Sequence, residues 1–345
     1  MLFKATVVQI RGVDGQLYTL AEEGHTPDSA AILLQPGAKG LDAPSFTTYA
    51  DEYPAIDGGF VRASRASMRE VFLPLKIIAP TRFEMMRLKR RFIASLNPTR
   101  GLVQLLTTEY TQVTPKDPLE AEPVRSLKCF YVSGMEGGES SSDGIHWATY
   151  GLILRAPYPY FQSLVRTDVS FVRYETLRPF IGEGSFLSLD GTTPGAGLGI
   201  SSDPTWITSL TINNPGEVLV YPRWHIRGPL NTTFSIHLHD VEGNVAKALR
   251  FFKPPGLLAD ETLIVEMARG EIDIYKSKTD GSGPKTPMWW AYDITSDMWP
   301  FQPGDNSVSL VIDKPTGMTP EQEAEWLTSN SPTMSVSYLP AYLGI

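Results

Sequence analysis

The sequence has very little of several features that would point to a particular chemistry. Its 345 residues include one cysteine, Cys129, so an internal disulfide and a site built from several thiolates are excluded. No apolar run approaches the roughly 20 residues that a membrane-spanning helix needs. The first ten residues lead directly into a strand pattern and do not resemble a signal peptide. We therefore expect a chain that folds in a cytoplasm and stays soluble.

Catalytic and cofactor motifs are also missing. The sequence contains no GxSxG, HExxH or P-loop motif and no helix with paired carboxylates. The Gly-rich stretch 190–199 lacks the GxGxxG spacing of a nucleotide site, and we predict that it is a loop. We expect neither an enzyme nor a cofactor. The alternative is an enzyme whose site is assembled from distant residues, which a deep cleft lined by carboxylates would indicate.

The chain lacks the strong basic excess of a nucleic-acid-binding protein. Residues 1–165 contain 17 Lys+Arg and 17 Asp+Glu, whereas residues 166–345 contain 13 and 21. The second part therefore carries the whole formal charge of −8. We expect no sequence-specific nucleic-acid binding by either part.

What the sequence does contain is many short strand-like runs between its 28 prolines and 29 glycines, a pattern typical of a mainly β protein. We predict an N-terminal β domain over residues 1–165, which the rigid aromatic run 156–161 brings to an end. Residues 166–206 are predicted to form a connector, because the helical pattern is already weak from residue 162 onward. The regular short strands of residues 207–345 predict an antiparallel β-sandwich.

Two helices interrupt this pattern. The first is predicted over residues 82–96, with a capping box from Thr81 to Glu84 and an end at Asn97-Pro98. Its apolar residues recur at spacings of three, four and seven, which predicts one buried stripe. That stripe consists of Phe83, Met86, Phe92, Ile93 and Leu96. The second helix is a short insertion at 319–327, capped by Thr319 and Gln322.

The opposite face of the first helix is basic. It carries Arg82, Arg87, Lys89, Arg90 and Arg91. A run of like charge is typical of a solvated helix face, and the alternative is a surface that binds an acidic partner. We hypothesise that this face and the strand edges of the first domain supply contacts between copies of the chain.

Two sets of residues in the second domain are candidates for ligand binding. Trp289 and Trp290 could stack against a sugar ring, although tryptophans in a sandwich are more often core residues. His237 and His239 point to the same side of a strand, but a metal would need a third ligand and none is visible. We expect ordinary histidines on a sheet face and no metal site.

Turn motifs recur along the chain in a definite order. The first half contains Pro36-Gly37, Asp57-Gly58-Gly59, Leu96-Asn97-Pro98 before Gly101, and Pro157-Tyr158-Pro159-Tyr160. The second half contains Asn214-Pro215-Gly216-Glu217, Tyr221-Pro222, Gly228-Pro229, Trp299-Pro300 and Gln302-Pro303-Gly304-Asp305-Asn306. In this order and spacing the chain resembles the distal tail protein family of long-tailed, non-contractile bacteriophages. We can place no counterpart in that family for the connector at 162–206 or the insertion at 319–327.

The resemblance implies a fold and a role. The first domain would be a split β-barrel-like domain with one α-helix, and the second a galectin-like antiparallel β-sandwich. Copies of the first domain would form a ring, typically a hexamer, that surrounds the genome passage and joins the tail tube to the baseplate or host-adsorption apparatus. The protein would be a structural subunit of the virion tail tip, assembled in the host cytoplasm.

The same resemblance implies the partners. They are further copies of the chain, the tail tube protein above the ring, and a tail-tip hub or tail-associated protein below it, with the tape-measure protein as a further candidate. The residues through which galectins hold sugar do not appear here as a recognisable set. The alternative function is a carbohydrate-binding module that recognises host cell-surface glycans through Trp289 and Trp290.

Overall fold

The chain divides into two compact units in the computed structural model. The structure describes residues 6–22, 30–54, 57–111, 120–121, 123–137, 146–171, 206–268, 271–313, 315 and 318–345. Unit 1 comprises Met1–Arg166, Gly216–Val218 and Leu339–Ile345, and unit 2 comprises Thr167–Pro215 and Leu219–Tyr338. Most of the predicted connector and the Gly-rich stretch 190–199 lie outside the described residues.

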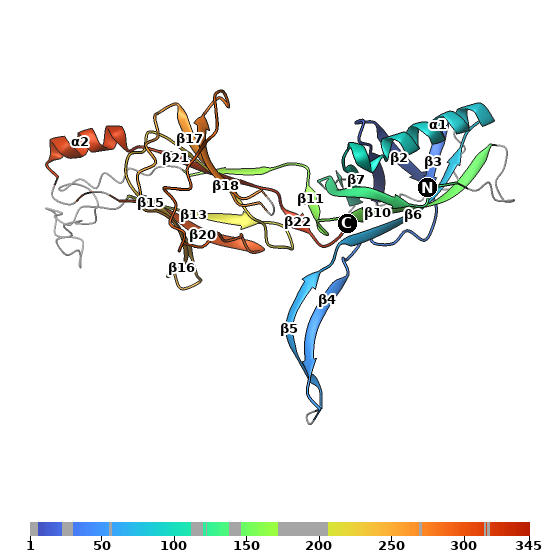
Figure 1. Cartoon of the computed structure of the whole chain (residues 1–345), viewed down its shortest axis with the longest axis horizontal. Coiled ribbons are helices and arrows are strands. Elements are labelled where there is room, and N and C mark those ends of the chain that lie inside the picture. Colours follow the sequence, from blue (N-terminus) through green and yellow to red (C-terminus); the bar gives the residue numbers. More distant parts are fainter. Residues whose placement is uncertain are drawn as a thin grey trace, which may run out of the picture. The chain divides into compact units, whose positions relative to one another are not determined.

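Unit 1 is built around a sheet that closes on itself (Figure 1). The strands of the whole of unit 1 are β1 (Thr6–Arg11), β2 (Leu17–Glu22), β3 (Ala31–Leu34), β4 (Phe46–Glu52), β5 (Gly59–Ala66), β6 (Arg69–Ile78), β7 (Val103–Thr111), β8 (Glu120–Ala121), β9 (Arg125–Ser133), β10 (Trp147–Ala156), β11 (Phe161–Ser163) and β22 (Ala341–Tyr342). Of these, β4 and β5 form a separate two-stranded sheet. Seven strands follow one another in the order β9-β10-β6-β3-β2-β1-β7, and β7 pairs back to β9. The mainly β fold and the barrel-like first domain are thus confirmed.

The interior of this barrel is apolar because its strands alternate strictly. In β6 the residues Val71, Leu73, Leu75 and Ile77 point inward and are completely buried, while the residues between them are exposed or half-buried. This is the period of two that a pleated strand imposes on its side chains. A single core cluster joins these residues to buried side chains of β1, β7, β9 and β10.

One α-helix, α1 (Arg82–Ser95), packs on the barrel core of unit 1, and a 3₁₀ turn, η1 (Pro98–Arg100), follows it. The Thr81 hydroxyl accepts a hydrogen bond from the Glu84 backbone N–H at 3.2 Å, as the predicted cap requires. The predicted buried stripe is wrong in part. Phe83 is 76% exposed, and Met85 is buried in its place together with Phe92 and Leu96.

The exposed position of Phe83 has a simple cause. Met85, Phe92 and Leu96 are seven and four residues apart, so they form one line along the helix. Phe92 lies on this line and makes an edge-to-face contact with Tyr18, their ring centroids 5.0 Å apart. Phe83 lies roughly 200° around the helix from Met85 and therefore points away from the barrel. Ile93 is likewise more than a third exposed.

The last seven residues return to unit 1, a feature that the sequence did not indicate. β22 pairs with β11, with Tyr342 opposite Phe161. The buried Arg69 donates to the backbone oxygen of Leu343, and Arg125 donates to that of Gly344 at 2.8 Å. The tail is therefore fixed to the barrel by strand pairing and by two guanidinium groups.

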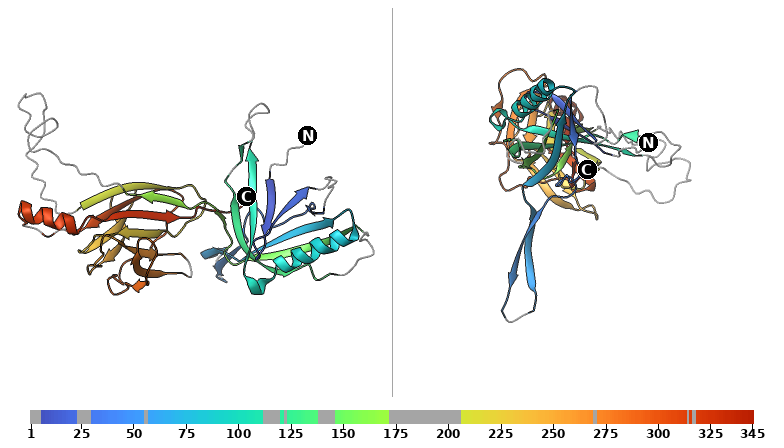
Figure 2. Two further views of the ribbon diagram at one scale, coloured as in Figure 1. Left: turned by 90° about the horizontal axis from the view of Figure 1, so that it is seen from above. Right: turned by 90° about the vertical axis from the view of Figure 1, so that its right-hand side faces the viewer.

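Unit 2 consists of two antiparallel sheets that face each other (Figure 2). Its strands are β12 (Thr167–Ser170), β13 (Trp206–Asn214), β14 (Arg223–Arg227), β15 (Phe234–His239), β16 (Val245–Phe251), β17 (Glu261–Glu266), β18 (Asp273–Lys278), β19 (Thr286–Pro287), β20 (Gly304–Ile312) and β21 (Thr333–Tyr338). One sheet has the order β12-β21-β14-β17-β18-β19 and the other β13-β20-β15-β16. The likeness to galectins in particular stays a prediction.

Aromatic side chains fill the space between the two sheets. Trp224 and Trp299 are completely buried, with ring centroids 5.6 Å apart, and Phe301 lies 5.8 Å from each. These edge-on and tilted arrangements are the ones that aromatic rings favour. The short helix α2 (Pro320–Ser329) begins as predicted, because Thr319 Oγ1 accepts from the Gln322 N–H and the Gln322 side chain accepts from the Thr319 N–H.

Candidate interaction surfaces

The most exposed element of unit 1 is the hairpin of β4 and β5, here called the arm (Figure 1). The two strands pair with each other over their whole length and form a sheet of their own. Nearly every residue of both strands is exposed, including large apolar ones such as Phe60 at 74% and Val61 at 65%. Neither face of the arm is covered by another part of the chain that the structure describes.

The arm is held by contacts between its own two strands. Arg62 forms an ion pair with Asp51, and the Arg65 guanidinium lies over the Tyr49 ring, 5.5 Å from its centroid. At its base the hydroxyls of Thr47 and Ser67 are 2.7 Å apart. Such exposed cross-strand pairs contribute roughly 0.2–1 kcal/mol each. The arm therefore has internal order but no core.

The sequence pattern indicates only the turn of the arm. The motif Asp57-Gly58-Gly59 is typical of a tight turn, and Gly58 has the positive φ of 91° that such a turn requires. The pattern did not predict β4. The signal was the turn itself, because a hairpin turn needs a second strand on its other side.

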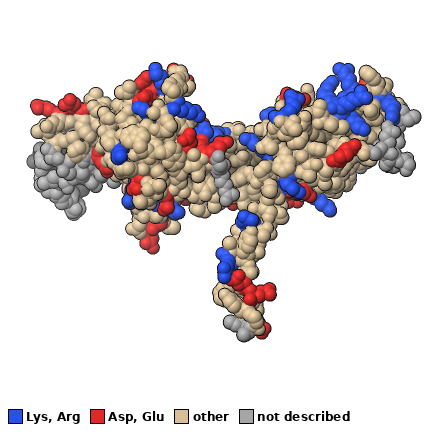
Figure 3. All heavy atoms as spheres, viewed as in Figure 1, with Lys and Arg blue, Asp and Glu red and all other residues tan. Residues whose placement is uncertain are grey.

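The predicted basic face of α1 is exposed on unit 1. Arg82, Arg87, Arg90 and Arg91 are solvent-exposed, and Lys89 is half-buried with its Nζ 5.1 Å from the centroid of the Tyr150 ring. Figure 3 shows Lys and Arg side chains gathered over this helix. The assignment of these five residues to an interface stays a prediction.

The four tryptophans considered above divide into two pairs. Trp224 and Trp299 belong to the core of unit 2, whereas Trp289 and Trp290 are 43% and 52% exposed. Trp289 is fixed in place, because its Nε1 donates to Asp273 at 3.3 Å and its ring contacts Tyr292 edge-on with centroids 6.0 Å apart. Its exposed surface is therefore a candidate platform for a ligand.

The two histidines of β15 contact their own sheet. His237 hydrogen-bonds Ser235 at 2.9 Å, and His239 hydrogen-bonds Ser309 at 2.7 Å. Burial, helped by the charges of His239 and Arg250, lowers the pKa of His237. Within the described ranges, no three residues of His, Cys, Asp or Glu come together as metal ligands would.

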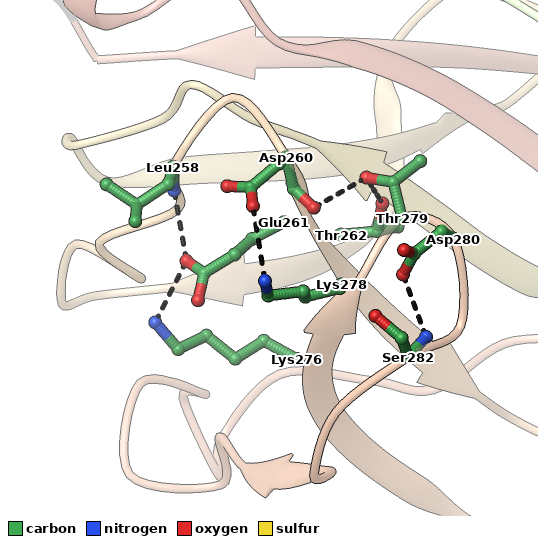
Figure 4. A network of polar contacts seen from close by, with 9 residues as sticks. All are labelled: Leu258, Asp260, Glu261, Thr262, Lys276, Lys278, Thr279, Asp280 and Ser282. Carbon is green, nitrogen blue, oxygen red and sulfur yellow. Dashed lines mark hydrogen bonds and ion pairs between the residues drawn. The ribbon is translucent and has the colours of Figure 1, made fainter.

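A polar network near the β17–β18 hairpin has a structural role (Figure 4). Glu261 accepts from the Leu258 backbone N–H at 3.0 Å and from Lys276 at 3.1 Å. Burial opposes ionisation of Glu261, but these hydrogen bonds and the charges of Lys276 and Lys278 outweigh it and lower its pKa. The members of the network bond within the hairpin or to the loops beside it.

The cysteine is a core residue of the barrel. Cys129 is completely buried on β9, and burial raises the pKa of its thiol to about 12 although Arg69 acts in the opposite direction. None of the helices in the described part of the chain is long and apolar enough to cross a membrane.

Comparison with known proteins bears on the fold. No family model and no curated protein sequence matches the chain. Among solved structures, it is similar to the Dit protein of bacteriophage SPP1, described as a paradigm of the hub adsorption apparatus in phages that infect Gram-positive bacteria. The TM-score is 0.56 at 14% identity, over 99% of this chain and 100% of that one.

A second similarity is weaker. It is to a chain of the activated baseplate of phage p2, with a TM-score of 0.42 and 11% identity over 92% of this chain and 100% of that one, and it adds nothing to the fold assignment. The resemblance to phage distal tail proteins is confirmed by the SPP1 structure at the level of the fold, along the whole chain.

Proposed function

We propose that this chain is a structural subunit of a bacteriophage tail tip, in which copies form a ring that surrounds the genome passage. The observation that carries the proposal is the fold, which matches a phage adsorption-apparatus protein from end to end and in both units. Fold alone does not determine function. The exposed arm adds an independent argument, because a hairpin that exposes large apolar side chains and has no core is typical of an element that packs on a partner.

In this role the chain is a structural building block, and its shape determines how copies of it assemble. Six copies would close the ring, with the tail tube protein on one side and a tail-tip hub or tail-associated protein on the other, and the tape-measure protein is a further candidate partner. The subunits would assemble in the host cytoplasm and remain in the virion. The role requires no catalytic residue, cofactor or metal.

The test is the mass of the purified full-length chain. We expect native mass spectrometry and light scattering to give a closed oligomer in equilibrium with the 38.1 kDa monomer. Particle images should show a ring with a central opening. A chain that stays monomeric at high concentration, alone and mixed with tail tube and hub proteins, would contradict the proposal.

A second candidate function is glycan binding by unit 2. It is favoured by the exposure of Trp289 and Trp290 and by the contacts that hold Trp289 in place. Aromatic rings offer large, rigid apolar faces to a flat ligand. We expect full-length chain to bind purified cell-wall polysaccharide from Gram-positive bacteria, and Trp289→Ala or Trp290→Ala to weaken that binding. Leu258→Ala, an exposed apolar residue away from the pair, is the control, and equal binding by all variants would exclude this site.

A further inference from the structure

We propose that the acidic tip of the arm of one copy docks on the arginine face of α1 of the neighbouring copy. This inference rests on the proposed ring and names the two surfaces that meet in it. Both surfaces belong to unit 1.

The tip of the arm combines negative charge with apolar surface. Glu52 and Asp57 are exposed at its distal end, next to the exposed side chains of Tyr53 and Phe60. The basic residue of this region, Arg62, is already paired with Asp51. A two-stranded hairpin with no third strand is marginally stable alone, so the arm needs a surface that covers its apolar residues and matches its carboxylates.

The exposed face of α1 has the complementary chemistry. Arg87 lies three residues from Arg90 and four from Arg91, so the three guanidinium groups are neighbours on the helix surface. None of them forms an ion pair with a carboxylate among the described residues. Like charges at this spacing destabilise a helix by roughly 0.2–0.5 kcal/mol per pair. Phe83, one turn before Arg87, places an exposed aromatic ring on the same face.

The arm cannot reach its own helix. The arm and α1 extend from opposite sides of unit 1, as Figure 1 and the right-hand view of Figure 2 agree. Strands of seven and eight residues span about 25 Å, so the arm carries its tip away from its own barrel. A closed ring is made by two different patches of each subunit meeting around an axis, and these two surfaces meet that requirement.

Charge reversal tests the pairing in the full-length chain. The arm variant is Glu52→Arg with Asp57→Arg, and the helix variant is Arg87→Glu with Arg91→Glu. Each creates like-charge contacts across the interface, so we expect each to raise the concentration needed for assembly by more than about tenfold. The control reverses Arg11 and Lys128, two exposed basic residues of unit 1 outside both surfaces. Circular dichroism and melting temperature establish that each variant is folded.

Two rescue experiments make the test specific. A chain that carries all four substitutions should assemble again, because its tip is basic and its helix acidic. An equimolar mixture of arm and helix variants should also assemble, with copies alternating around the ring, because every junction then joins opposite charges. Native mass spectrometry of isotope-labelled chains would show both variants in one particle.

The outcomes separate the two proposals. Assembly of the arm and helix variants at the wild-type concentration would overturn the pairing and leave the ring intact. Loss of assembly in folded variants without rescue in either experiment would overturn the pairing as well. A wild-type chain that never assembles would overturn the ring and the pairing together.

Discussion

One added methyl group at Gly344 should detach the C-terminal tail from the barrel of unit 1. A Cβ at this position would lie 1.9 Å from the backbone oxygen of Asp42, so the tail must move. The displaced segment contains the oxygens of Leu343 and Gly344, which accept hydrogen bonds from Arg69 and Arg125. Gly344→Ala therefore tests whether these bonds hold the tail in place.

The expected cost follows from the two guanidinium contacts. A hydrogen bond to a charged group contributes about 1.5–3 kcal/mol, and relaxation will recover part of the loss, so we expect about 3 kcal/mol. The loss of these hydrogen bonds affects mainly Arg69, because this side chain is only 1% exposed. Its burial also lowers its pKa to about 10. Without Leu343 its remaining acceptors are the oxygens of Gly40 and Leu41, at 3.4 and 3.3 Å.

The assay is calorimetric unfolding of the full-length chain, combined with digestion by a carboxypeptidase. For a unit of this size, 3 kcal/mol corresponds to a fall in Tm of about 6–12 °C, and the released tail should be trimmed much faster. The control is Leu343→Ala, which removes an exposed side chain and keeps the backbone acceptor. If both variants melt together and their tails are equally protected, the guanidinium contacts do not fix the tail.

The local environments of other residues predict three more outcomes. The Cys129 thiol, with a pKa raised to about 12, should react with a thiol reagent at least about a hundredfold more slowly in the native than in the denatured chain, and equal rates would contradict its burial. Because the pKa of Glu261 is lowered on folding, its contribution to stability is present above its unfolded pKa and is lost as the pH falls. Measured by urea unfolding, Glu261→Gln should lower the free energy of unfolding by about 1 kcal/mol at pH 7 and not at all at pH 2. A difference that does not depend on pH would exclude the ion pair with Lys276 as the cause. Phe92→Ala should cost about 3–5 kcal/mol in the same assay and Phe83→Ala less than about 0.5, and equal costs would refute the orientation of α1.

Local periodicity determined how much of the fold could be predicted. The alternation of apolar residues in β6 can be recognised in the sequence, because it matches the pleat of a strand buried on one face. The cap of α1 was found because Thr81 and Glu84 act through bonds within four residues. The buried face of α1 was predicted less well, since Phe83, Met86 and Ile93 form a second apolar line beside the one that Met85 and Phe92 occupy.

Features that depend on distant residues were not predictable from the sequence. The pairing of Phe161 with Tyr342 joins the segments that precede and follow unit 2 in the sequence, and no local pattern encodes it. The same holds for tryptophan burial, because only the packed sandwich makes Trp224 a core residue and leaves Trp290 exposed. β4 was missed for the opposite reason: nothing described in the chain covers it, so burial has imposed no alternation on its sequence.

Closure of the barrel changes where contacts between copies of unit 1 can form. Unpaired strand edges are the usual route to strand-mediated association, and the sequence led us to expect them as ring contacts. In the described part of unit 1 the seven barrel strands leave no long free edge, and the strands that end the sheet, β8 and β22, have two residues each. The proposed association between copies would then use side-chain surfaces or the arm. Of these, the acidic tip of the arm and the basic face of α1 are exposed, opposite in charge and on opposite sides of unit 1, as the proposed contact between copies requires.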